Sequence, residues 1–155
     1  MNRFAAAPLT MLVLVVGLVA CGGSDAPSKA DFAKSADEIC NNAEKALQNV
    51  GKDANTPAEI AAAVDRVIDQ TQKSVDDLKG LDRPDGDAGK AADKFIGALS
   101  SDIEDKGLPA LKELRDAIKK NDRQAAQKAA ERLQAIQTTN SDQLARDIGA
   151  KGCAD

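Results

Sequence analysis

Apolar residues recur every three or four positions along most of the chain, and this spacing constrains the fold more than any other feature. Side chains at that spacing lie along one face of an α-helix, which can be buried against other helices. The chain is therefore predicted to be all-α. Four such stretches occur, from Phe32 to Val50, between Thr56 and Gly80, from Ala92 to Ile118, and from Asp122 to Ile148.

Residues typical of helix N-termini mark the start of the first two stretches. Thr56 is followed by a proline and then by Glu59, which combines an N-cap with the acidic partner of a capping box. Ser28 and Asp31 resemble a capping box in which aspartate takes the place of glutamate. These local signals agree with the helices that the apolar spacing predicts.

The third and fourth stretches each contain an irregularity. Gly107 and Pro109 interrupt the third, but the apolar positions keep their phase across the interruption. Because proline lacks an N–H group and its ring collides with the preceding turn, we predict one helix that is kinked at Gly107 and Pro109. The fourth stretch contains a polar segment, residues 138–141, where the helix is expected either to bend or to break.

Four amphipathic helices joined by short turns are typical of an antiparallel up-down four-helix bundle, and we predict this architecture for residues 31–155. Its core would consist of Ala, Leu, Ile and Val side chains, with Phe32 and Phe95 as aromatic members. In this topology the fourth helix runs antiparallel beside the first. The C-terminal tail is therefore expected next to the first half of the first helix.

The N-terminal region has the pattern of a bacterial lipoprotein. An apolar run of about a dozen residues suits a signal peptide and falls short of the roughly 20 residues that cross a bilayer. We predict that residues 1–20 are cleaved off and that diacylglycerol is attached to the new N-terminal cysteine, with a second acyl group for stable anchoring. An uncleaved signal anchor is the alternative. The lipobox that supports cleavage consists of Leu18, Val19, Ala20 and the lipidated Cys21.

Residues 21–30 are small and polar and contain a proline, so we interpret them as the lipidated cysteine followed by a flexible tether. The predicted location is the cell membrane, with the domain facing the extracytoplasmic side. The membrane contact is the covalent lipid on Cys21.

Two cysteines remain once Cys21 carries lipid, namely Cys40 and Cys153. Disulfides form and persist outside the cytoplasm, and the number of remaining cysteines is even. The predicted topology also brings the C-terminal tail close to Cys40. We therefore predict a Cys40–Cys153 disulfide, with two free thiols as the alternative.

The chain lacks the residue types of common catalytic and metal centres. It contains no histidine, so no imidazole base, no Ser-His or Cys-His pair and no histidine metal ligand is available. We predict that the protein is not an enzyme and that it has no cofactor and no metal site. Its 21 basic and 25 acidic residues are interspersed, which argues against a nucleic-acid-binding surface.

Two acidic clusters contain carboxylates of the kind that bind cations. Residues 82–87 resemble a calcium loop only weakly, because their spacing does not match and no glutamate closes the loop. Asp102, Glu104 and Asp105 near the predicted kink suggest a metal or cationic-ligand site. We instead expect a solvated loop with a helix cap in the first case and the solvent-facing side of a helix in the second.

Several short patterns together resemble a family of small secreted proteins and lipoproteins of high-GC actinobacteria. They are the SADEIC segment at residues 35–40, the loop from Leu81 to Pro84, the Asn-Asp turn at 121–122, and Gly152-Cys153 near the C-terminus. The resemblance covers the chain after the signal peptide and implies a helical bundle pinned by a disulfide. The chain departs from the family pattern in two places. Its loop has one proline where two are usual, and its last residues are Ala154-Asp155. No assigned activity comes with the resemblance.

From these features we expect a lipid-anchored, non-catalytic envelope protein that presents a helical bundle to a protein partner or to the cell wall. The alternative is a lipoprotein that binds a small ligand in a cavity between the helices. The sequence favours this alternative less than the interaction protein, because an alanine-rich core with few aromatic residues is poorly suited to stacking on sugars or aromatic rings.

Overall fold

The structure is a computed structural model that describes residues 25–154; the predicted signal peptide, the lipobox and Cys21 lie outside the described residues. Residues 25–154 form helices and loops and contain no strand, so the all-α prediction is confirmed. The elements are α1 (Lys29–Leu47), α2 (Pro57–Lys79), α3 (Gly86–Ser100), the π-helix η1 (Ser101–Gly107), α4 (Leu108–Lys119), α5 (Arg123–Gln134), α6 (Thr139–Ile148) and the 3₁₀-helix η2 (Lys151–Cys153). No helix of this part of the chain combines the length and apolar character needed to span a bilayer.

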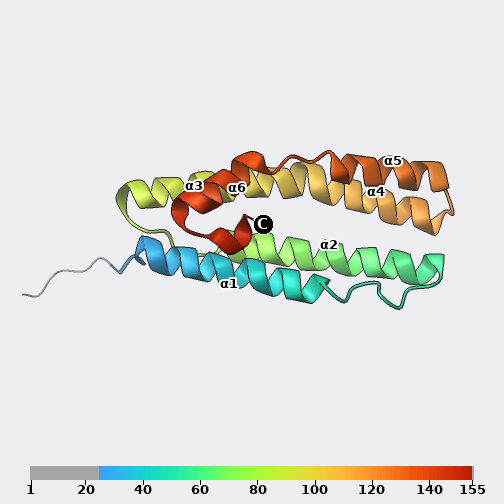
Figure 1. The fold of residues 1–155 in the computed structure, drawn as a ribbon, viewed down its shortest axis with the longest axis horizontal. Coiled ribbons are helices and arrows are strands. Elements are labelled where there is room, and N and C mark those ends of the chain that lie inside the picture. The colour runs from blue at the N-terminus through green and yellow to red at the C-terminus, as the bar shows by residue number, and fades with distance from the viewer. Residues whose placement is uncertain (1–24, 155) are drawn as a thin grey trace, which may run out of the picture.

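The helices pack side by side into an elongated helical bundle (Figure 1). Helix α1 lies along α2, and α2 packs against α4. Helix α5 covers α4, whereas α6 covers α3, so the two last helices lie end to end over the long α3–η1–α4 segment (Figure 1). The C-terminal η2 then crosses back to α1.

The predicted capping signals form at both N-termini. At α2, Thr56 Oγ1 accepts a hydrogen bond from the N–H of Glu59 (3.3 Å), and Glu59 Oε2 accepts one from the N–H of Thr56 (2.9 Å). At α1, Ser28 Oγ accepts from the N–H of Asp31 (3.1 Å). These bonds satisfy N–H groups that the first turn of a helix leaves without partners.

The first two helices differ from their predicted limits at one end each. Helix α1 ends at Leu47, three residues before Val50, and a turn through Gly51 follows. In the first turn of α2, Ile60 keeps 40% of its surface exposed, although the spacing assigned it to the apolar face. Figure 1 shows α2 extending past the end of α1, where a loop takes the place of the helix. The predicted burial of Ile60 was wrong because α1 ends before it reaches that part of α2.

The third predicted helix is one continuous helical segment with a π-helical middle. The π-helix η1 runs to Gly107, and the N–H of Leu108 bonds to the carbonyl oxygen of Ile103, five residues earlier. Pro109 has no N–H to donate to the carbonyl of Asp105, so an α-helical bond is unavailable there. The wider π turn lies immediately before this missing bond.

The fourth predicted helix is divided in two. Asp122 caps α5, with Oδ1 accepting a hydrogen bond from the N–H of Ala125 (3.0 Å). Helix α5 ends at Gln134, and residues 135–138 are not helical before α6 begins at Thr139. The helix therefore breaks rather than bends, a few residues earlier than the centre of the polar segment.

The main core lies at the end of the bundle where α1 begins. Phe32 and Phe95 are its largest buried side chains, and the rest of it is mostly alanine, leucine and isoleucine from α1, α2, α3, α6 and the C-terminal tail. All the buried residues of α1, namely Phe32, Ala33 and Ala36, belong to its first half. The second half of α1 contains no buried residue and packs less closely on its neighbours.

Candidate functional site

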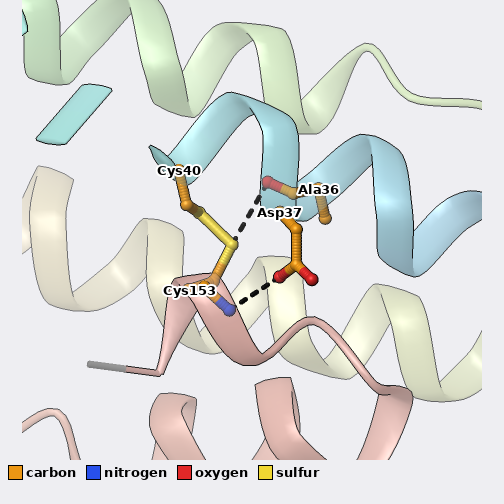
Figure 2. Close-up of a disulfide and its surroundings, with 5 residues drawn as sticks. Ala36, Asp37, Cys40 and Cys153 are labelled. Carbon is orange, nitrogen blue, oxygen red and sulfur yellow. Dashed lines mark hydrogen bonds between the residues drawn. A yellow bond between two sulfur atoms is a disulfide. The ribbon is translucent and has the colours of Figure 1, made fainter. Parts of the chain in front are cut away.

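The Cys40–Cys153 disulfide is present, as predicted, and joins the middle of α1 to η2 (Figure 2). The Cα atoms of the two cysteines lie 5.3 Å apart, within the normal range for a disulfide, although 113 positions separate them in the sequence. The bond closes almost the whole domain into a covalent loop.

A hydrogen bond accompanies the disulfide. The N–H of Gly152 donates to Oδ1 of Asp37 across 2.8 Å (Figure 2). Cys153 Sγ also lies 3.3 Å from the carbonyl oxygen of Ala36; because a disulfide sulfur carries no hydrogen, this is a close contact rather than a hydrogen bond. We call Asp37, Cys40, Gly152 and Cys153 the C-terminal clasp.

Asp37 was not singled out from the sequence as a functional or structural residue. A signal was nevertheless available, since Asp37 lies three positions before Cys40, and residues at that spacing share one face of a helix. Gly152 also has a steric role: a Cβ atom there would lie 2.9 Å from Nδ2 of Asn41. A side chain at position 152 would therefore require the exposed amide group of Asn41 to move.

Further contacts hold the tail against the bundle. Gly149, with φ of 95°, ends α6 in the left-handed conformation that glycine adopts without strain. Ala150 is then fully buried, and Ala154 is almost so. Arg146 Nη1 donates to the carbonyl oxygen of Ala154 (3.2 Å). The tail is thus packed and hydrogen-bonded as well as covalently linked.

A groove of about 510 Å³ lies beside the C-terminal clasp, between the second half of α1 and the bundle. Its volume falls within the range of small-molecule sites. Aliphatic side chains form most of its wall, polar side chains lie among them, and no aromatic residue takes part. The lining residues are Cys40, Asn41, Ala43, Glu44, Leu47, Thr71, Ser74, Val75, Leu78, Leu99, Ile103, Gly152 and Cys153. We call this feature the clasp groove.

A second depression, of about 560 Å³, lies where the chain passes from α5 to α6. Five of its nine lining residues are charged or polar, and they include the ion pair of Arg132 with Glu113. Its apolar residues are small apart from Pro109 and Ile136. The clasp groove is the better candidate for a ligand site, since aliphatic wall with a few polar groups is the usual composition of such sites.

The acidic cluster in η1 differs from its predicted exposure. Asp102 is buried, with 8% of its surface exposed, and accepts hydrogen bonds from Ser141 Oγ (3.0 Å) and Lys106 Nζ (2.6 Å). The expectation that it lies on the solvent-facing side of a helix was wrong. Asp102 lies three positions after Leu99, on the side of the helix that faces α6, and bonds there to Ser141, a buried residue of α6.

The other members of that cluster lie nearer the surface. Glu104 accepts hydrogen bonds from Lys79 Nζ (2.6 Å) and Gln72 Nε2 (3.4 Å), and the Lys79 bond is the main reason that the pKa of Glu104 lies below its ordinary value. Asp105 is exposed and accepts from Ser101 Oγ (2.8 Å). The three carboxylates are thus engaged by different partners.

The loop with residues 82–87 is placed at the surface. Asp85 is exposed and occupies the N-cap position of α3, where its side chain makes no capping hydrogen bond. Among the described residues, no group of three or more cysteine, aspartate or glutamate side chains is arranged to hold a metal ion.

The fold and the site define a disulfide-closed helical bundle with an aliphatic groove at the bond that closes it. Comparison of the chain with protein-family models, with curated proteins and with solved structures found no match.

Proposed function

We propose that this protein is a lipid-anchored, non-catalytic binding protein of the cell envelope, facing the extracytoplasmic side. The lipobox at residues 18–21 supports the anchor, and the disulfide supports an oxidising compartment.

We also propose that the domain is an antiparallel up-down bundle of four helical segments. The third segment is α3–η1–α4, kinked at Gly107 and Pro109, and the fourth is α5–α6. The side-by-side packing in Figure 1 supports this arrangement.

The clasp groove is the observation that carries the binding role. Contact with a protein partner or with the cell wall through the outer helix faces was the leading expectation from the sequence. The groove favours the second candidate, a small ligand held between the helices, because its volume and aliphatic wall suit one. No side chain in the groove is a histidine, and both cysteines there are joined in the disulfide, so the groove favours binding over nucleophilic catalysis.

Anchoring is tested by growing cells with an alkyne-bearing fatty acid and comparing the wild type with Cys21→Ser. The wild type is expected to carry the label and to fractionate with membranes, whereas the variant is expected to carry no label. A labelled variant, or an unlabelled wild type, would contradict the proposed anchor.

The mode of binding is tested by crosslinking in cells from a small aliphatic residue that carries a diazirine and leaves the groove open, placed at position 43, and from the same residue at the exposed position 42. A small-ligand site predicts protein adducts from neither position and a small-molecule mass shift from position 43 alone. A single protein captured from position 43 would favour the partner-binding candidate.

A further inference from the structure

We propose that the clasp groove binds the hydrocarbon chain of a single-chain aliphatic amphiphile with a cationic head group. The inference deepens the small-ligand candidate above and rests on it. It is drawn from the composition, burial and charge of the groove wall.

The wall selects for a flexible hydrocarbon chain. Leu47 of α1, Leu99 of α3 and Ile103 of η1 are only half-buried, so their apolar surface in the groove is open to water. Val75 and Leu78 of α2 lie buried beneath them. Covering such surface is favourable for any aliphatic ligand. With no aromatic side chain in the wall, flat rings and sugars have nothing to stack on.

The construction of α1 explains why this groove is open. Beyond Ala36 no residue of α1 is buried, yet the disulfide at Cys40 fixes the middle of the helix in place. The second half of α1 therefore forms one side of the groove. It is held at Cys40 by the disulfide and is incompletely packed on the bundle beyond that residue. Ala43 and Leu47, on the groove side of this wall, are half-buried.

The charge at the rim favours a cationic head group. Glu44 is the one charged residue among those that line the groove, and it is exposed. No lysine or arginine is among them, so an anionic head group would find no charged partner and would face a carboxylate. Asn41, on the next turn of α1, adds an amide oxygen that accepts hydrogen bonds. A cationic amphiphile would thus lie with its hydrocarbon chain in the groove and its head group beside Glu44.

The test is calorimetric titration of the oxidised domain with dodecylammonium and with dodecanoate, both below their micelle concentrations. These probes share a chain and differ in the sign of the head group. Both are expected to bind, with dodecylammonium about fivefold tighter, since one exposed charge pair contributes no more than that. Both probes are therefore expected to raise the melting temperature, and dodecylammonium is expected to raise it more than dodecanoate at the same concentration.

Two variants locate the site. Ala43→Trp fills the groove and is expected to weaken binding of both probes at least about tenfold; Asn42→Trp adds the same bulk at the exposed neighbouring position and should leave binding unchanged. Glu44→Lys alters an exposed residue, so folding is preserved, and it should reverse the preference in favour of dodecanoate. Helix content and melting temperature without probe establish that each variant is folded.

Absence of binding by either probe would overturn the inference, as would equal loss in Asn42→Trp and Ala43→Trp or an unchanged preference in Glu44→Lys. The proposed function fails by a different result, namely the absence of fatty-acid label on Cys21. A protein captured at position 43 would overturn the amphiphile but leave the anchored binding role in place.

Discussion

The N–H of Gly152 donates a hydrogen bond to Oδ1 of Asp37 across 2.8 Å, joining residues that are 115 positions apart. The disulfide between Cys40 and Cys153 lies directly beside it (Figure 2). One helical turn of α1 and two consecutive residues of the tail therefore make both a polar and a covalent link. The SADEIC and Gly-Cys patterns, which lie at opposite ends of the domain sequence, form one structural unit.

Replacing Asp37 by alanine should lower the free energy of unfolding by about 1 kcal/mol, because the N–H of Gly152 loses its acceptor in a half-buried place. Urea unfolding without reductant measures the loss while the disulfide is intact. The matched control is Glu38→Ala, which removes an exposed carboxylate 4.0 Å from Lys34 and should change stability little. Equal losses in the two variants would contradict a specific role for Asp37.

Removing the disulfide by Cys40→Ser with Cys153→Ser should lower the free energy of unfolding by up to about 5 kcal/mol. The bond closes a loop of 113 positions, and the chain-entropy cost of closing a loop grows with its length. The midpoint of denaturant unfolding measures the loss, with the reduced wild type as a second reference. Two reactive thiols in the unfolded, unreduced wild type would show that the bond is not formed.

Replacing Asp102 by alanine should destabilise the domain by about 1 kcal/mol, because the bond that joins η1 to the buried Ser141 is lost while Ser141 keeps the carbonyl oxygen of Thr138 as its acceptor. The Ser141 hydroxyl also lies 2.9 Å from the carbonyl oxygen of Thr138, within α6's own first turn. Hydrogen exchange should therefore accelerate in α6 more than in α2. Asp105→Ala, at the exposed neighbour, is expected to stay within about 0.5 kcal/mol of the wild type.

Two glycines of α3 should respond in opposite ways to alanine. A Cβ atom at Gly89 would overlap the backbone carbonyl oxygen of Pro84, so Gly89→Ala is expected to cost about 1–3 kcal/mol. A Cβ atom at Gly97 meets nothing within 4 Å, so Gly97→Ala should stabilise the helix by up to about 1 kcal/mol. Thermal unfolding of the two variants checks the sign of each change.

Stability should be nearly constant between about pH 5 and 8 and should fall below that range. The pKa values of three carboxyls lie below their ordinary values: Glu59 accepts backbone N–H groups, Asp65 accepts from Lys119, and Glu104 accepts from Lys79. The unfolded chain therefore binds protons at a higher pH than the folded one, and stability declines as the pH falls through about 4. The chain has no histidine to titrate at neutral pH. Melting temperatures across the pH range measure the effect, and a decline that begins near pH 6.5 would contradict it.

Most of the helical structure could be predicted from the sequence, because helix starts depend on neighbouring residues. The cap at Thr56 bonds to a residue three positions away, and the apolar spacing of α2 records its buried face. The disulfide could be predicted for a related reason: two cysteines, a predicted oxidising compartment and one topology left a single pairing. The helix signals are local in the sequence, and the disulfide follows from the number of cysteines together with the predicted topology.

Positions near the irregular helices were predicted less well. Asp102 was assigned to the surface because charged side chains usually face solvent. The structure instead buries it, with Ser141 Oγ and Lys106 Nζ as its hydrogen-bond partners. The break after Gln134 likewise lies earlier than the polar residues suggested.

The sequence by itself determined most of the helices and the caps at Ser28, Thr56 and Asp122, because these depend on residue type and short-range spacing. It also indicated the pairing of Cys40 with Cys153, through the number of cysteines and the predicted topology. Only the tertiary structure decided that Asp37 meets Gly152 and that a groove lies open beside them. Both features depend on the distance between α1 and helices that are far from it in the sequence. That distance is set by how the side chains of several elements pack together, and short-range sequence patterns do not predict it.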